Sequence, residues 1–190
     1  MVTDFFKVSN LFLYERKLDN FLLLQKSESP IQIYFLDVDG CKKVASENNW
    51  QANFTISINE ILENTDVCAV AEFNQRLAHW TQISFGGAYV AEIDKKIRVD
   101  SKSAYLHGIY TEKDFRKMGI ASAVMEKVSA YLLERGISRL YILVDSRNPS
   151  MLRVVAKAGF KRIGAIKLTK IGKLKLYRRK GKISDFLESK

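Results

Sequence analysis

Short apolar runs broken by polar turns, the pattern of β-strands, follow one another between residues 67 and 111. Four successive segments are rich in β-branched and aromatic residues and are separated by turn signals at 74–76 and 86–87. These segments are residues 67–73, 77–85, 88–99 and 103–111. Because short turns join them, we expect an antiparallel meander.

The chain before residue 67 mixes strand and helix signals. A strand or hairpin arm is expected at 10–18, a short apolar run at 21–24 and a strand at 31–36. Short polar oxygens can satisfy the free amides of a first helical turn. Asp37 or Asp39 can therefore cap a helix over 41–49, and Ser57 can cap another through Leu62.

The apolar period becomes helical after residue 119. Apolar side chains recur every three to four residues from Ile120 to Leu132, and Gly136 follows, which predicts a long helix over 120–135. A buried strand, a helix with proline in its first turn and a closing pair of strands should follow. They cover residues 139–144, 149–158, 161–169 and 173–179. This order predicts an α/β fold with a mixed sheet and flanking helices.

Composition adds a domain plan to this picture. The 190 residues are 47% hydrophobic, enough for one buried core. We expect residues 1–30 to form an N-terminal extension, a strand or hairpin arm, and residues 31–190 to form the main domain. The first residues lack the pattern of a secretory leader, and no apolar run reaches the roughly 20 residues of a membrane span. We therefore expect a cytoplasmic protein, monomeric or homodimeric, without a membrane span.

The net charge of +10 comes from one segment. Residues 161–182 contain ten Lys or Arg and no acid, whereas the other 21 basic residues equal the 21 acidic ones in number. Such a segment attracts polyanions, whether nucleic acid, an acidic protein face, anionic lipid or a phosphorylated cofactor. Alternatively, its lysines are solvated residues of edge strands that discourage sheet-to-sheet aggregation. Both interpretations stay open.

Cysteine spacing argues against metal chemistry. Cys41 and Cys68 are the two cysteines of the chain, and they form no CxxC or Cys/His ligand pattern. We expect neither a disulfide framework nor a metal site, and we interpret both residues as buried thiols.

The segment most informative about chemistry joins the strand at 103–111 to the long helix. It contains a glycine, Gly119, where a backbone amide cluster can approach an anion closely and where the helix dipole favours negative charge. Arg116 and Lys117 add positive charge, and Ser122 adds a hydroxyl in the first turn. The segment therefore predicts a cradle for a pyrophosphate.

Two motifs resemble those of the GNAT superfamily of acyl-CoA N-acyltransferases. Arg116, Gly119 and Ala121 fill its Q/RxxGxG/A signature, and Asn148 lies eleven residues before the Gly159–Phe160 pair of a second family element. The resemblance extends over about residues 31–179, with residues 31–190 as the N-acetyltransferase domain. It implies a GNAT-like fold in which the meander leads to a splayed parallel strand pair.

The resemblance also implies that acetyl-CoA lies between the strands ending at Thr111 and Val144. Backbone groups at the end of the first strand would bind the pantetheine arm, and amides from Met118 to Ser122 would bind the pyrophosphate. Asn148 would fix the loop or the pantetheine, and Arg153 or Lys157 could meet the ribose phosphate, although both could also lie on a solvated helix face. The implied cofactor-binding residues are Ile109, Tyr110, Thr111, Arg116, Lys117, Met118, Gly119, Ile120, Ala121, Ser122, Asn148 and Arg153.

The implied reaction is transfer of an acetyl or similar acyl group to a primary amine by direct attack in a ternary complex. The amine must lose its proton, the acyl oxygen needs a donor such as a backbone N–H of the splayed strand, and the departing thiolate needs a proton. Many relatives carry a tyrosine four residues before the glycine of the second motif. Val155 stands there, which leaves Tyr110, Tyr141 or water as the proton donor.

His107 is the favoured general base. Strand alternation places it on the same face as Tyr105 and Ile109, and an imidazole titrates near neutral pH. A lone histidine in a strand is, however, more often a hydrogen-bonded core residue. Tyr105 is a weaker candidate, and Glu72 and Glu92 could act through water.

The acceptor is expected to be a small-molecule or protein amine. Its pocket could be lined by aromatic residues of the first helices and the meander, although packing in the core is an alternative role for them. These residues are Trp50, Trp80, Phe85 and Tyr89.

Two other functions stay open. A binding module could keep the fold without transfer activity, in line with Val155 and the basic segment. More remotely, the letters IYFLDVDGC at 33–41 look like the first motif of haloacid dehalogenase-type phosphatases, in which the first aspartate is the nucleophile. Cys41 stands in place of the usual threonine, and a strand followed by a capping aspartate gives the same letters.

Overall fold

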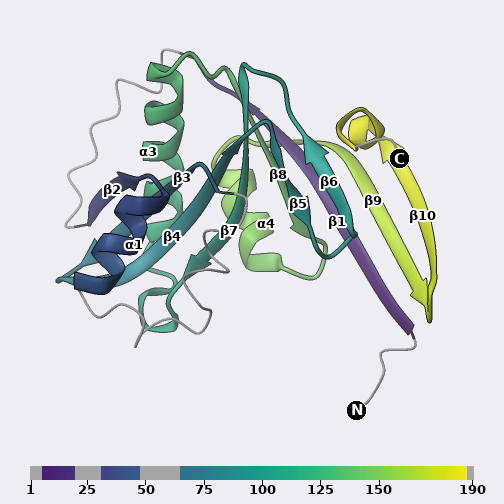
Figure 1. Ribbon diagram of the computed structural model, residues 1–190, viewed down its shortest axis with the longest axis horizontal. Coiled ribbons are helices and arrows are strands. Elements are labelled where there is room, and N and C mark those ends of the chain that lie inside the picture. Colours follow the sequence, from purple (N-terminus) through teal and green to yellow (C-terminus); the bar gives the residue numbers. More distant parts are fainter. Residues whose placement is uncertain (1–5, 20–30, 48–64, 188–190) are drawn as a thin grey trace.

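The computed structural model describes residues 6–19, 31–47 and 65–187. In this part of the chain, eight strands form one sheet in the order β10-β9-β1-β8-β7-β4-β3-β2 (Figure 1). The strands are β1 (Phe6–Lys17), β2 (Gln32–Leu36), β3 (Val67–Phe73), β4 (Arg76–Phe85), β7 (Ser103–Thr111), β8 (Arg139–Asp145), β9 (Lys161–Ile171) and β10 (Leu174–Gly181). Strands β7 and β8 are parallel and their other neighbours antiparallel, so the predicted mixed α/β sheet is confirmed.

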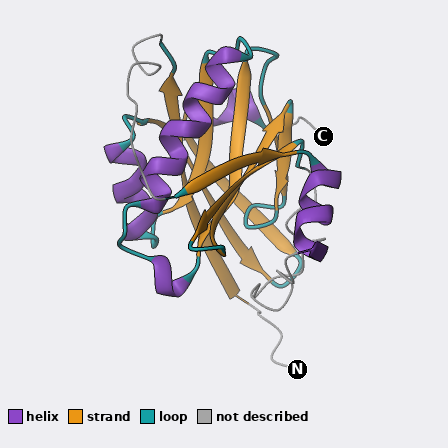
Figure 2. Ribbon diagram, turned by 90° about the vertical axis from the view of Figure 1, so that its left-hand side faces the viewer, coloured by secondary structure: helices purple, strands orange, loops and turns teal. Residues whose placement is uncertain are grey.

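Helices lie on both sides of this sheet (Figure 2). The helical segments are α1 (Val38–Glu47), η3 (Lys113–Phe115), α3 (Ile120–Glu134), α4 (Pro149–Lys157) and η4 (Lys182–Phe186). On one side of the sheet, here called the helical face, α3 buries the apolar stripe that begins at Ile120, and α4 buries Val155. No helix of the described residues is both long enough and apolar enough to cross a bilayer.

The prediction of a single strand over residues 88–99 is wrong. This segment forms a separate hairpin of β5 (Gly87–Val90) and β6 (Lys95–Arg98). Its turn is closed by the Ile93 amide, which donates to the Val90 carbonyl at 3.2 Å, and Asp94 has a φ of 49°. Aspartate tolerates this left-handed conformation better than most residues. The hairpin packs on the opposite side of the sheet, here called the hairpin face.

Helix α1 begins earlier than residue 41 because Asp37 is its cap. The Asp37 carboxylate accepts a hydrogen bond from the Gly40 amide at 2.6 Å, and Asp39 instead pairs with Lys42 at 3.4 Å. The letters that look like a phosphatase motif therefore form strand β2 and a capped helix. The segments at 21–24 and 57–62 and the side chain of Trp50 lie outside the described residues.

Strand β1 lies inside the sheet, between β8 and β9 (Figure 1). It pairs with β8 from Leu11 to Lys17 and with β9 from Phe6 to Glu15. Leu13 is completely buried on the hairpin face. The strand expected at 10–18 is thus present and has neighbours on both sides, and the domain boundary at residue 30 stays a prediction.

The two cysteines lie together although they are 27 positions apart in the sequence. Cys41 in α1 and Cys68 in β3 are free and buried, in one apolar cluster with Trp80. A hydrogen bond between the thiols lowers the pKa of Cys41, and the same bond together with burial raises the pKa of Cys68. Within the described ranges, no three His, Cys, Asp or Glu side chains gather as metal ligands would.

Candidate functional site

The site begins where β7 and β8 separate. Their parallel pairing joins residues 103–106 of β7 to residues 139–142 of β8 and ends at the pair Leu106–Ile142. Beyond that pair β7 continues to Thr111 and β8 to Asp145, so the two strand ends diverge. The predicted splayed pair is present, and it leaves the edge of β7 that faces β8 open to a ligand.

A bulge in β7 bends the strand at this point. Trp80 of β4 pairs with Tyr110, whereas Gln82 pairs with His107, so two residues of β7 oppose one of β4. Gly108 has a φ of 51°, and a Cβ there would lie 1.5 Å from the Gln82 Oε1. Only glycine fits this position without displacement of the Gln82 side chain. Bulges of this kind end regular pairing and redirect side chains beside a site.

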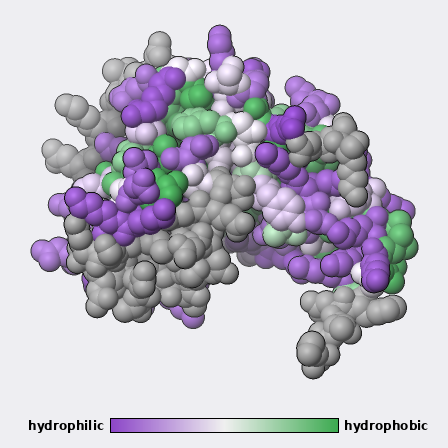
Figure 3. Space-filling model, viewed as in Figure 1, coloured by the Kyte–Doolittle hydropathy of each residue, from purple (hydrophilic) through white to green (hydrophobic). Residues whose placement is uncertain are grey.

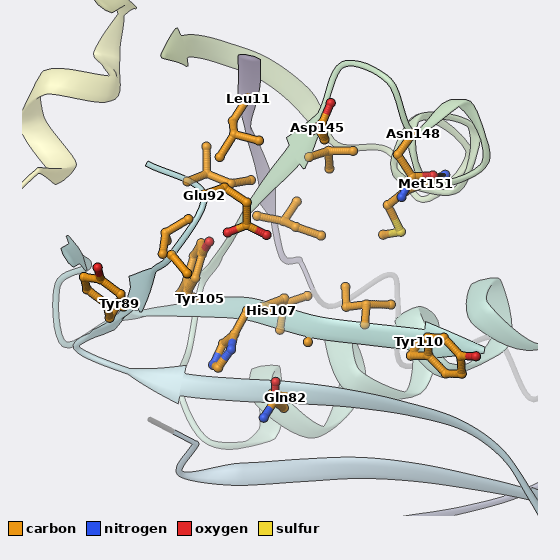
Figure 4. A pocket seen from close by; sticks show the side chains of 18 of the residues that line it. Leu11, Gln82, Tyr89, Glu92, Tyr105, His107, Tyr110, Asp145, Asn148 and Met151 are labelled. Carbon is orange, nitrogen blue, oxygen red and sulfur yellow. Dashed lines mark hydrogen bonds between the residues drawn. The ribbon is translucent and has the colours of Figure 1, made fainter. Parts of the chain in front are cut away.

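The larger cleft, with a volume of about 650 Å³, lies over this bulge (Figure 4). Tyr89, Glu92, Tyr105 and His107 line one part of it, and residues at the start of α4 line another. Its acidic residues are Glu92 and Asp145, and no Lys or Arg of the described chain lines it. Arg147 lowers the pKa of the Asp145 carboxyl through two hydrogen bonds, at 2.8 and 3.1 Å.

His107 extends from β7 on the hairpin face and is half-buried. Its Nε2 shares a hydrogen bond of 2.8 Å with the Ser84 hydroxyl, and its ring stacks against that of Tyr105 with centroids 5.6 Å apart. These contacts hold the imidazole in the cleft wall. An imidazole in this position can accept a proton from a bound amine.

The three candidate tyrosines differ in access. Burial raises the pKa of Tyr105 well above its ordinary value, and the nearby Glu92 raises it further. Tyr141 does not line either cleft; its hydroxyl donates to Glu15 at 2.8 Å, and burial together with this bond raises its pKa to about 12. Tyr110 lines both clefts and stacks on Trp80 with centroids 4.6 Å apart.

The other acidic and aromatic candidates differ in whether they line a cleft. Glu72 lies in β3 and lines neither cleft, whereas Glu92 lines the larger one. Trp80 and Tyr89 line the larger cleft, and Phe85 lies outside it with 40% of its surface exposed. Val155 is the buried residue of α4 and presents an apolar side chain to the core.

The smaller cleft, of about 570 Å³, lies between the start of α3 and α4. Four cationic side chains line it and no acidic one of the described residues does. They are Arg116, Lys117, Arg153 and Lys157. Ile109, Tyr110, Asn148 and Met151 line both clefts, so the two adjoin at the end of β7.

The turn before α3 is shaped to expose backbone amides. Lys117 has a φ of 67° and Gly119 a φ of 79°, and Gly119 caps α3 without a side-chain hydrogen bond. In the described chain, the amides of Lys117 and of residues 119–121 find no backbone acceptor, whereas the Ser122 amide already donates to the Gly119 carbonyl at 3.0 Å. Successive free amides at a helix start bind anions.

Arg116 holds this turn in place, and Asn148 of the second motif caps the neighbouring helix α4. The Arg116 Nε donates to the Thr111 carbonyl at 2.9 Å, and the guanidinium lies over the Tyr110 ring, 5.4 Å from its centroid. Asn148 caps α4, because its Oδ1 accepts the Met151 amide at 3.0 Å. Met118 does not line the cleft and is 49% exposed.

Three polar residues near the bulge were absent from the sequence hypotheses. Ser84 is the partner of His107, and Gln82 is 4% exposed with its Nε2 unpaired in the described structure. His79 bonds the Thr111 hydroxyl at 2.7 Å and the Thr81 hydroxyl at 2.9 Å, which anchors the end of β7. All three lie on β4, and only the register of β4 against β7 assigns them to the site.

The arrangement suits a ligand with phosphates at one end and an extended arm. The cationic cleft and its free amides match phosphate oxygens, and the unpaired edge of β7 matches an arm that carries amide groups. The adjoining anionic cleft then meets the end of that arm beside His107. Chemically, the two clefts can bring a group on the arm to a second, cationic molecule.

Comparison with known proteins gives a family for this arrangement. The model of the Acetyltransferase (GNAT) family matches residues 32–160. A search of curated proteins found no significant match. Solved structures from 9 to 18% identical share the fold.

Three of these structures illustrate the likeness. A GNAT-family acetyltransferase from Novosphingobium aromaticivorans is 18% identical, with a TM-score of 0.58 over 86% of this chain and 64% of its own. A GCN5-related N-acetyltransferase from Sphaerobacter thermophilus is 14% identical, with a TM-score of 0.55 over 93% of this chain and 53% of its own. A GNAT-family acetyltransferase from Colwellia psychrerythraea is 13% identical, with a TM-score of 0.53 over 93% of this chain and 57% of its own. The chain thus spans less than two thirds of the length of these proteins.

Proposed function

The chain belongs to the GNAT acetyltransferase family, and from this premise we propose that it transfers an acetyl group from acetyl-CoA to a primary amine. One observation carries the proposal: a cationic cleft and an anionic cleft adjoin at the bulge where β7 leaves β8. A phosphorylated donor and a cationic acceptor can each enter the cleft of opposite charge and meet at that point.

The donor end of the proposal rests on the turn at residues 117–121 and its surroundings. Free amides and the α3 dipole bind the pyrophosphate, and Arg153 or Lys157 binds the remaining phosphate. Arg116 acts mainly by tying this turn to Thr111. The arm then follows the open edge of β7 towards His107.

The chemistry begins with the acceptor amine, which attacks only as the neutral base. His107, held by Ser84, takes the proton from the amine. A backbone N–H at the bulge donates to the acyl oxygen as negative charge develops there. Acetyl-CoA supplies the activated acyl group as a thioester, and Tyr110 or water returns a proton to the departing sulfur.

The acceptor is an amine that carries a second positive charge. The larger cleft presents Glu92 and Asp145 and no Lys or Arg among the described residues, in a chain whose net charge is +10. Arg147 already neutralises Asp145, so Glu92 is the main site for the second charge. Diamines should therefore react faster than monoamines of equal length.

Release of the CoA thiol from acetyl-CoA in the presence of mono- and diamines tests the proposal. The glycine variant Gly119→Glu should lose CoA affinity, measured by calorimetry, because it places bulk and negative charge at the phosphate position. Gly136→Glu is a matched control: Gly136 ends α3 with a φ of 77°, and like Gly119 it has no atom within 4 Å of an added Cβ. Equal CoA affinity of both folded variants would contradict the placement of the pyrophosphate.

A second candidate is a binding module without transfer activity. Val155 favours it, because this fully buried apolar residue replaces the family's usual proton donor. The same assay separates the two candidates. A chain that binds CoA in calorimetry but releases no thiol with any amine in the panel would be such a module.

A further inference from the structure

Strands β9 and β10 extend the sheet beyond the part that α3 and α4 cover (Figure 1). On the hairpin face, Ile166 and Leu168 of β9 are buried together with Ile183 of η4. The alternate residues of β9 point to the helical face. There the side chains of β9, β10 and the start of β1 are half-buried or exposed.

The register brings apolar side chains together on this side. Phe6, Ile171 and Leu174 are opposite one another on three adjacent strands, and Leu176 lies in the next row, opposite Thr169. The exposed fractions of the four apolar side chains are 63, 38, 57 and 50% respectively. This apolar end lies at the tip of the β9–β10 hairpin, and hydrophobic residues are visible at that edge of the molecule in Figure 3.

The rows that follow are basic. Lys167 and Arg178 form one opposed pair, and Lys180 lies opposite Ala165 in the next row. All three are exposed, and the segment from residue 161 to 182 contains no acid that could neutralise them. We call these three residues together with the apolar end the open face.

We propose that the open face docks on a lipid surface rich in anionic headgroups. The aliphatic tip enters the headgroup region, and the basic rows lie against the lipid phosphates, the combination that binds peripheral proteins to membranes. None of the open-face residues lines either cleft, and the proposal does not depend on the acyl-transfer reaction.

The same features disfavour two other occupants. A second copy on this face would bring its Lys167, Arg178 and Lys180 against those of the first copy, with no acid in either segment 161–182. Single-stranded nucleic acid is held by aromatic side chains that stack on bases, whereas three of the four exposed apolar residues are aliphatic. Aliphatic side chains beside a basic field fit a lipid surface better.

Co-sedimentation of the full chain with vesicles tests this proposal. We expect binding to vesicles that contain phosphatidylglycerol and none to vesicles of phosphatidylcholine alone. Lys167→Gln with Arg178→Gln should weaken binding about 30-fold, and Leu174→Ser with Leu176→Ser should weaken it at least about tenfold. Lys113→Gln with Lys127→Gln is the charge-matched control, and Tyr34→Ser is the control for an exposed apolar residue, since Tyr34 is 41% exposed.

The salt dependence of vesicle binding, and binding assays with the other two occupants, complete the test. Because the Debye length shortens from about 10 Å at 0.1 M salt to about 3 Å at 1 M, high salt should weaken the vesicle binding of the unaltered chain. Equal vesicle binding of all folded variants would overturn the proposal. Failure of the unaltered chain to bind anionic vesicles would overturn it as well. Tight binding of single-stranded RNA, or a dimer in light scattering that the leucine variants abolish, would then identify the occupant of the open face.

Discussion

At the residue scale, the assignment of His107 as base makes a kinetic prediction. His107→Ala should lower kcat by about 100-fold or more while CoA affinity changes little, because the imidazole acts on the acceptor rather than on the phosphates. Steady-state kinetics and calorimetry measure the two quantities separately. Ser84→Ala should keep activity and shift the acid limb of the pH–rate profile, since it removes the 2.8 Å hydrogen bond to Nε2. An unaltered profile and kcat in both variants would remove His107 from the mechanism.

The other histidine makes a prediction about stability. Burial lowers the pKa of His79 from 6.5 to about 3, so the folded chain does not take up the proton that the unfolded chain binds below pH 6.5. The free energy of unfolding should therefore fall as the pH drops from 6.5 towards 3, by up to about 1.4 kcal/mol per pH unit. Urea denaturation at pH 7, 6 and 5 measures this dependence. A His79→Gln variant should show a shallower slope between those pH values, and an identical slope would refute the assignment.

Sequence and structure agree unevenly at this scale. Motifs singled out Arg116, Gly119 and Asn148, and the structure places them at a turn and two helix caps, which need those residue types at fixed spacing; their roles in the site stay predictions. Ser84 was not found, because its contact with His107 depends on how β4 and β7 are shifted by the bulge. Tyr141 was considered as a proton donor, but a contact with Glu15, 126 positions away in the sequence, occupies its hydroxyl.

At the element scale, the bulge in β7 makes a prediction about packing. Gly108→Ala should cost more stability than Gly86→Ala, because a Cβ at Gly108 meets the Gln82 side chain whereas one at Gly86 meets no atom within 4 Å. Both glycines have a positive φ, so each variant also costs about 1 kcal/mol of backbone strain. Thermal or urea denaturation gives the difference. In Gly108→Ala with Gln82→Ala the clash should be relieved, and a strictly additive double variant would argue against it.

Most elements were predictable from periodicity, with ends within three residues. Strands at 67–73 and 103–111 were predicted with the observed limits, and the helix expected at 120–135 runs from 120 to 134. The prediction of one strand over residues 88–99 was wrong, because its apolar residues continue through the turn. Only Asp94 and its neighbours mark the reversal of the chain between β5 and β6. Periodicity reports the face a residue takes, whereas a two-strand hairpin and one long strand can share that pattern.

At the scale of the whole molecule, strand order was beyond the reach of the sequence. The pattern identified a strand near residues 10–18 but did not place it between β8 and β9, because pairing partners are chosen by tertiary contacts. The contact between the buried thiols of Cys41 and Cys68 could not be predicted for the same reason. The charge division between the clefts also emerges only when Glu92 and Arg153 are placed in three dimensions.

The position of β1 predicts how the molecule responds to its loss. β1 supplies the hydrogen bonds that join β9 and β10 to the rest of the sheet, so its removal divides the sheet between β8 and β9. Leu13→Ala should lower the free energy of unfolding by about 2–5 kcal/mol because Leu13 is completely buried, and the exposed Lys7→Ala on the same strand should change it by less than about 0.5 kcal/mol.

Deletion of residues 1–30 tests the same point at full scale. If this segment is a dispensable extension, the shortened chain will unfold cooperatively and still bind CoA. We expect instead that cooperative unfolding in urea is lost, because the buried side chains of β8 and β9 lose the strand between them. Circular dichroism follows the transition. Calorimetry with CoA shows whether the part from β2 to α4, which carries every residue that lines the two clefts except Leu11, can hold its shape alone.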